Sequence, residues 1–194
     1  MDQQGQTMGK NASSTATGML YAAVDAEKRG DRTAAAKIYR ELIEVQPDCA
    51  PAYLSLGTLY YQQKRYPEAA DYYRRALELK TDYSLAHFNY ASTLEELGRF
   101  DEAIKSYQRA IEVNPRYCDA HYNLALAYQR AGNDRKSLYH WSAYVRLDSS
   151  NSDWVKFARA EIRKLLRKQP LRVVSSNLRS ARTNDSPSVL FVVA

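Results

Sequence analysis

The chain has 194 residues, 45% of them hydrophobic, and a formal net charge of +6 at neutral pH. No run of about 18 apolar residues occurs, and the N-terminus lacks a basic start followed by an apolar stretch, which argues against a membrane span or secretory signal and predicts a cytoplasmic protein. The charge is uneven, because residues 152–194 carry 9 Lys and Arg against 3 Asp and Glu, whereas residues 1–151 carry 19 of each.

Taken in chain order, the sequence predicts a disordered start followed by helices in pairs. Residues 1–15 are mostly polar, so they bury too little apolar surface to offset the entropy of ordering. From there apolar residues recur at helical spacing, and Gly or polar residues mark short turns. The predicted helices span 17–29 and 32–45, 51–63 and 67–79, 84–97 and 101–113, 118–131 and 135–147, and finally 152–168.

The pairs repeat with a 34-residue period. Residues 57–82 align with 91–116 and again with 125–150. Small residues recur where two helices must approach closely, as at Gly57, Ala91 and Ala125, and bulky ones recur opposite them. A fixed period of this length predicts a stacked array of helix-turn-helix units, and such arrays commonly serve as binding surfaces.

The last predicted helix, 152–168, has one apolar face and no partner helix, as the terminal cap of an open stack requires. Pro170 ends it. The remaining segment, 169–194, is basic and rich in Ser, Arg and Asn, so we expect it to be mostly disordered. It closes with the apolar run VLFVVA.

The repeated residues resemble the tetratricopeptide repeat (TPR) family. The resemblance rests on the turn GRFDEA (98–103), the near match YPEAA (66–70), and prolines at 47 and 115. It implies an all-α, right-handed α-solenoid over 16–168. Its implied repeats are 16–49, 50–83, 84–117 and 118–151, capped by 152–168. The closing stretch from His140 to Leu166 looks like the last repeat and cap of bacterial cytoplasmic repeat proteins.

In such an array the first helix of each pair lines the concave face. Reading every third or fourth position on those helices gives a mixed surface, apolar with amides between. The resulting candidate peptide-binding residues are Leu54, Thr58, Tyr61, Phe88, Asn89, Ser92, Tyr122, Asn123, Leu126 and Arg130.

Asn89 and Asn123 are the sharpest functional signal. An Asn side chain offers one acceptor and two donors, so it can pair with both polar groups of an extended peptide backbone. The pair resembles the asparagine ladder of peptide-binding arrays in the family, although the preceding repeats carry Ser55 and Tyr21 instead. The alternative interpretation is that these Asn residues satisfy local polar groups.

Other chemistries find little support. The positions at which the family's carboxylate clamp places Lys hold Leu54, Phe88 and Tyr122, so binding of a C-terminal carboxylate is not expected. His87 and His121 lie one period apart at a packing position and lack further ligands for a metal. No nucleophile and base are paired, and no phosphate loop occurs. We therefore predict a non-enzymatic protein without cofactor or metal.

The leading hypothesis is a scaffold or adaptor that holds an extended segment of a partner protein in the concave groove. A second hypothesis is an accessory nucleic-acid or transcription-related protein that acts through the basic end, although no binding motif accompanies it. A third is a homo-oligomer linked either through the exposed seam of the array or through the VLFVVA run, which can add as a strand or fill a groove. The alternative interpretation is that the VLFVVA run is an aggregation-prone segment without a function. The basic residues on which the second hypothesis depends are Arg159, Arg163, Lys164, Arg167, Lys168, Arg172, Arg179 and Arg182.

Overall fold

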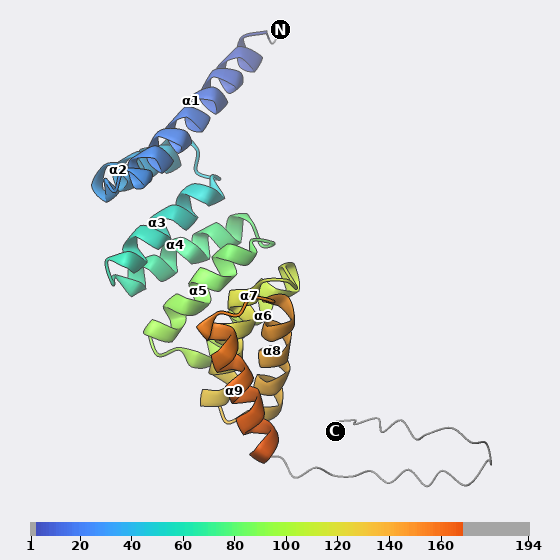
Figure 1. The fold of residues 1–194 in the computed structure, drawn as a ribbon. Coiled ribbons are helices and arrows are strands. Elements are labelled where there is room, and N and C mark those ends of the chain that lie inside the picture. The colour runs from blue at the N-terminus through green and yellow to red at the C-terminus, as the bar shows by residue number, and fades with distance from the viewer. Residues whose placement is uncertain (1–2, 169–194) are drawn as a thin grey trace, which may run out of the picture.

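A computed structural model describes residues 3–168 of the chain, with side chains described from Thr15 onward. Over this range the secondary structure is helical throughout, without strands (Figure 1). The helices are α1 (Gln3–Lys28), α2 (Arg32–Val45), α3 (Ala50–Gln62), α4 (Tyr66–Leu79), α5 (Ser84–Glu96), α6 (Phe100–Val113), α7 (Cys118–Arg130), α8 (Asp134–Leu147) and α9 (Asp153–Lys168).

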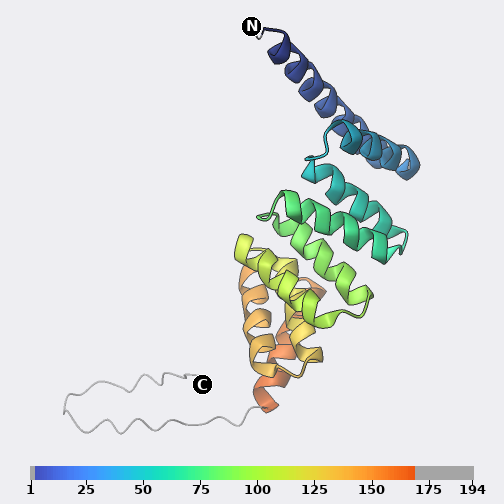
Figure 2. The same ribbon diagram turned by 180° about the vertical axis from the view of Figure 1, so that it is seen from behind.

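The helices form four hairpins that stack one on the next, with α9 packed on α8 at the end (Figures 1 and 2). Each hairpin contacts mainly its neighbours in sequence, so the core is a seam that runs along the stack. This architecture is the predicted right-handed α-solenoid with a C-terminal capping helix.

The predicted helix boundaries agree with the observed ones to within one residue, except at the N-terminus. There α1 begins at Gln3, so the helix includes most of the segment 1–15 that we expected to be disordered. Once a helical turn has formed, each added residue gains a backbone hydrogen bond, and no proline interrupts this stretch. The basic segment 169–194, with its VLFVVA run, lies outside the described residues.

The turns inside the hairpins need a left-handed backbone conformation. Three of them place Gly there, with φ of 80° at Gly30, 74° at Gly98 and 71° at Gly132. The α3–α4 turn instead has Lys64 with a φ of 60°, a conformation that costs a side-chain-bearing residue about 1 kcal/mol or more. The polar substitute recognised in the sequence therefore adopts the same turn as glycine, with some strain.

One bulky aromatic residue from each second helix fills the seam. Tyr39, Tyr73, Tyr107 and Trp141 follow one another at the period of the repeat, and each is almost fully buried. A small residue faces the ring on the first helix, and at Gly57 the fit is closest. A Cβ atom there would lie 2.7 Å from the Tyr73 ring, which is closer than van der Waals contact.

Among the helices of residues 3–168, none is long and apolar enough to cross a membrane.

Candidate functional site

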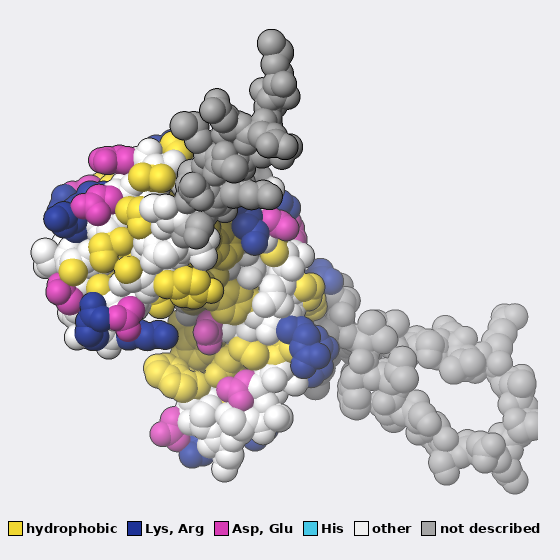
Figure 3. Space-filling model, turned by 90° about the horizontal axis from the view of Figure 1, so that it is seen from above, with side chains coloured by type: hydrophobic (Ala, Val, Ile, Leu, Met, Phe, Trp, Pro, Cys, Tyr) yellow, Lys and Arg dark blue, Asp and Glu magenta, His cyan; other side chains and the backbone are white. Residues whose placement is uncertain are grey.

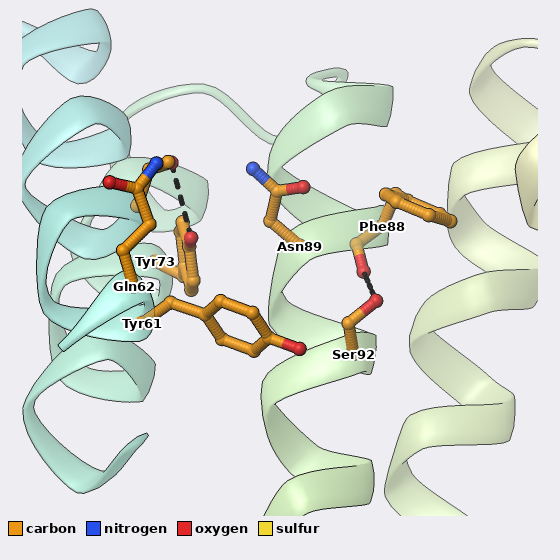
Figure 4. A pocket seen from close by; sticks show the side chains of 7 residues that line it. Tyr61, Gln62, Tyr73, Phe88, Asn89 and Ser92 are labelled. Atoms are coloured by element: carbon orange, nitrogen blue, oxygen red, sulfur yellow. Dashed lines mark hydrogen bonds between the residues drawn. The ribbon is translucent and has the colours of Figure 1, made fainter. Parts of the chain in front are cut away.

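A pocket of about 320 Å³ opens between α3 and α5 (Figure 4). We call it the groove pocket. Tyr61 and Asn89 reach toward each other from the two helices, whereas Phe88 leaves α5 on the side away from Asn89. The lining residues are Thr58, Tyr61, Gln62, Tyr73, Phe88, Asn89 and Ser92. Seen from above the stack, hydrophobic side chains gather in and around a hollow of the surface (Figure 3).

Tyr73 of α4 lines the groove pocket, and its hydroxyl forms a hydrogen bond with a residue of α3. It donates to Thr58 Oγ1 at 3.2 Å, and Thr58 in turn donates to the Leu54 carbonyl oxygen at 3.1 Å. Burial raises the pKa of Tyr73 to about 12, a rise that its hydrogen-bonding neighbours Thr58 and Asn89 partly oppose. Asn89 is therefore a polar neighbour of a buried tyrosine as well as a groove residue.

The same arrangement recurs one repeat later, around Tyr107. Its hydroxyl donates to Glu95 Oε2 at 2.7 Å and lies 3.0 Å from Ser92 Oγ. Because the phenol proton goes to Glu95, the Asn123 amide must donate to the phenol oxygen, and Asn123 Nδ2 lies 3.2 Å from it. Burial also raises the pKa of Tyr107, so the phenol stays neutral.

The buried aromatic residue of the second helix differs between repeats, and the residue that it contacts on the next first helix differs with it. In the first repeat the buried Tyr39 hydroxyl has no partner at hydrogen-bonding geometry, and its polar neighbours are Glu27 and Ser55, which holds the Asn position. At the far end Trp141 replaces Tyr, and Phe157 of α9 holds that position with its ring centroid 5.8 Å from the Trp141 ring. The alternative interpretation of the Asn residues, that they satisfy local polar groups, thus describes part of their role.

That local role leaves each amide with binding capacity. An Asn side chain has two N–H donors and one carbonyl acceptor. Asn123 donates one N–H to the Tyr107 oxygen, which leaves one N–H donor and the carbonyl acceptor of its amide for a ligand. These are the two groups that one peptide unit requires.

Of the ten candidate residues, five line the groove pocket: Thr58, Tyr61, Phe88, Asn89 and Ser92. Asn123 lies one repeat further along the array, half-buried. Leu54 is only 7% exposed and belongs to the core, so it offers little surface to a ligand. Helical periodicity placed it on the correct helix face but did not reveal how closely the neighbouring helices cover it.

Tyr122 and Leu126 pack within the C-terminal core cluster. The Tyr122 ring lies edge-on to Trp141 and to Trp154, with centroid distances of 4.9 and 5.6 Å. Aromatic side chains of the cap α9 therefore contact part of the groove face of α7, and both residues are half-buried. The sequence did contain a signal for this, because Trp154 and Phe157 continue the 34-residue register into α9.

Two carboxylates, Glu95 and Glu96, lie close to Tyr61 of the groove pocket. Glu95 is paired with Arg130 across α5 and α7, with 2.8 Å between Oε1 and Nη1. Exposed Glu96 lies near Tyr61 and Tyr66, and burial, together with the negative charge of Glu96, raises the pKa of both phenols. Arg130 is thus engaged with Glu95, and the local charge at the pocket edge is negative.

Among the histidines, His121 is buried, and His87 and His140 are half-buried. His87 Nε2 lies 2.9 Å from the Thr81 carbonyl oxygen. His121 and His140 meet through their Nδ1 atoms at 3.1 Å, a contact that the repeat pattern does not predict. Burial lowers the pKa of His140 to about 4. No cluster of three or more His, Cys, Asp or Glu suited to a metal occurs among the described residues.

The basic residues of α9 face solvent and are partly neutralised within the described chain. Lys164 Nζ lies 3.5 Å from Glu161, and Lys168 Nζ lies 3.5 Å from Asp134. Arg159, Arg163 and Arg167 are exposed. The same helix carries two exposed aromatic side chains, Trp154 and Phe157, and both rings contact Tyr122.

An open array of stacked helical hairpins with a pocket between two first helices defines a helical repeat protein. Family models described as tetratricopeptide repeat match residues 21–84 and 72–105, and one described as TPR repeat matches 93–132. Together these matches cover more than half of the chain. The chain belongs to the tetratricopeptide repeat family, whose members act as protein-interaction scaffolds.

Solved structures agree on the fold. A crystal structure of MamA has a TM-score of 0.67 at 20% identity, and the alignment covers 80% of this chain and 88% of that one. A tetratricopeptide repeat protein from Parabacteroides merdae scores 0.69 at 21% identity, covering 80% and 61%. An O-GlcNAc transferase mutant from Thermobaculum terrenum scores 0.64 at 26% identity, covering 70% of this chain but 26% of that one. No curated protein matches the chain.

Proposed function

We propose that this protein is an adaptor that holds an extended segment of a partner protein in its concave groove, over α3, α5 and the start of the α7 surface. The partner segment lies across the first helices and places an apolar side chain in the groove pocket. Its backbone pairs with the free donor and acceptor of Asn89 and of Asn123. The protein itself performs no chemistry in this role.

The observation that carries the proposal is the hydrogen bond that holds the Asn123 amide one repeat from Asn89. Asn123 is already oriented by Tyr107, so little side-chain entropy is lost when a peptide binds. Successive first helices are at least about 10 Å apart because a second helix lies between them, which is about three residues of extended chain. The pair therefore suits backbone contacts at every third residue or so.

A peptide-library selection tests the proposal. Random extended peptides are selected on the wild-type chain, and the affinity of the best binder is measured by fluorescence anisotropy. We expect Asn89→Ala with Asn123→Ala to weaken binding about tenfold or more, because two pairs of backbone hydrogen bonds are lost. An apolar residue at one position of the selected peptides should also be required.

The matched control separates binding from stability. Tyr73→Phe with Tyr107→Phe removes the hydroxyl that orients the Asn123 amide and the hydroxyl beside Asn89, but leaves both Asn residues in the groove. We expect this variant to lose some stability in urea while it retains most of the affinity. If the Asn variant binds as well as the wild type, or if no peptide is selected, the proposed function is wrong.

A further inference from the structure

Residues 189–193 (VLFVV) have the chemistry that the groove pocket requires. They are consecutive apolar residues, β-branched or aromatic for the most part, in an otherwise polar segment. Such a sequence favours an extended backbone. Left in water, it is also the kind of segment that aggregates. A pocket of about 320 Å³ bordered by Tyr61 and Phe88 is large enough for one of its side chains.

The connection from the described structure is long enough. The last described residue is Lys168, at the end of α9, and the segment 169–188 separates it from Val189. A flexible coil of that length has a root-mean-square span of about 25 Å, and the fully extended chain reaches about 65 Å. The groove pocket lies two repeats before the cap, or about 20–30 Å away at the usual packing distance of helices.

The charges of the connecting segment and of the groove surroundings are complementary, which also favours binding of residues 189–193 there. The connecting residues include Arg172, Arg179 and Arg182 against the single acid Asp185. Glu96 lies close to Tyr61 of the groove pocket, and the cation Arg130 on α7 is already paired with Glu95. Opposite charges near the two binding surfaces raise the encounter rate and set the direction of the bound segment.

We infer that residues 189–193 of the same chain occupy the groove pocket, so that a partner segment must displace them. A connection whose span matches the distance gives an effective concentration in the millimolar range, so even weak contacts suffice to keep the groove occupied. The competition with a partner rests on the proposed function, whereas occupation of the pocket does not. The apolar run is thereby kept from self-association.

Photo-cross-linking in the full chain tests this inference. A benzophenone side chain replaces Phe191, and after illumination the cross-linked peptides are identified by mass spectrometry. We expect products within single chains that join position 191 to α3 or α5. The same group at Asn177, in the middle of the connection, should yield far fewer of them. Products on other surfaces, or products between two chains that increase with protein concentration, would overturn the inference.

Two groove variants and one control sharpen the interpretation of that experiment. Tyr61→Ala removes part of the pocket wall, so we expect the yield of groove cross-links to fall about fivefold or more. Glu96→Lys leaves packing intact and reverses one exposed charge, so a smaller reduction of about two- to fivefold is expected, and added salt should diminish it. Phe100→Ala, an exposed aromatic on α6 outside the groove pocket, should leave the yield unchanged.

The peptide selected on the wild-type chain distinguishes failure of this inference from failure of the proposed function. If residues 189–193 compete, Leu190→Asp with Phe191→Asp should bind that peptide several-fold more tightly than the wild type. Tight binding by the wild type with no groove cross-links, and no gain in the Asp variant, would reject only the inference. Neither binding nor cross-links would reject both.

Discussion

The central repeats and the capped end use the same positions of the 34-residue period for different chemistry. Around Tyr73 and Tyr107, buried hydroxyls bond to polar side chains that also face the groove. Around Trp141, the corresponding partner is Phe157 of α9, and the groove face is covered by aromatic contacts. One change on a second helix, from Tyr to Trp, thus accompanies the change from an open groove to an end covered by α9.

The capped end should depend most strongly on Trp141. Its ring is fully buried between α7, α8 and α9, and its Nε1 donates to Gln129 Oε1 at 3.1 Å. We expect Trp141→Ala to lower the free energy of unfolding by about 3–5 kcal/mol, as other large-to-small core substitutions do. Urea unfolding followed by circular dichroism measures the loss. Trp154→Ala is the control, because that ring is 64% exposed, and it should cost far less.

The central repeats should be most sensitive at Gly57. The Cβ atom of Gly57→Ala would lie 2.7 Å from the buried Tyr73 ring, which cannot move without disturbing Thr58 and the groove pocket. Overpacking of this kind costs about 1–3 kcal/mol. Ala91→Gly, at the same position one repeat later, is the converse change and creates space instead of a clash. If Gly57→Ala melts at the wild-type temperature, the central seam is looser than the structure indicates.

Acid should weaken the capped end before the central repeats. His140 faces His121, and burial followed by the positive charges of His121 and Lys136 lowers the pKa of His140 to about 4. The unfolded chain binds the proton with an ordinary His pKa of about 6.5, so stability falls as the pH drops from about 6.5 toward 4. The slope is at most about 1.4 kcal/mol per pH unit, and partial exposure of the ring reduces it.

The measurement is the unfolding free energy of wild type and His140→Ser between pH 7 and pH 4.5. Ser106 holds this position in the preceding repeat and donates to the His87 carbonyl oxygen, so the substitution converts the end repeat to the central pattern. We expect the variant to lose less stability over this range. The same pH dependence in both proteins would place the titrating group elsewhere.

The helices and their stacking could be predicted from the sequence because they depend on periodicity and turn residues, both of which are local. Gly98 and Pro115, for example, mark helix ends directly. The surface of the groove was predicted less completely. Whether Leu54 or Tyr122 is accessible depends on how closely a neighbouring helix covers it, and periodicity carries no measure of that distance.

The state of the asparagine pair shows the same limit. Their 34-residue spacing identified Asn89 and Asn123, but the orientation of the Asn123 amide follows from where the Tyr107 proton goes, and that depends on Glu95. Tyr73 was recognised as a packing residue, yet its hydroxyl also borders the groove pocket. A sequence pattern assigns one role to a residue, whereas a side chain that lies between the core and the groove, such as Tyr73, contributes to both.

The ion pair between Arg130 and Glu95 joins the two regions and should matter least for stability. The Arg130 side chain is 61% exposed, so solvent screens the interaction, and exposed pairs contribute about 0–1 kcal/mol. We expect Arg130→Gln to change the unfolding free energy by less than about 0.5 kcal/mol. A double-mutant cycle with Glu95→Gln measures the coupling, and a value above about 2 kcal/mol would mean that the pair fastens the central repeats to the end.

The same variant, Arg130→Gln, should also change peptide binding. It removes the cation paired with Glu95, while Glu95 still accepts the hydrogen bond from the Tyr107 hydroxyl. We therefore expect it to bind a basic groove peptide more tightly than the wild type.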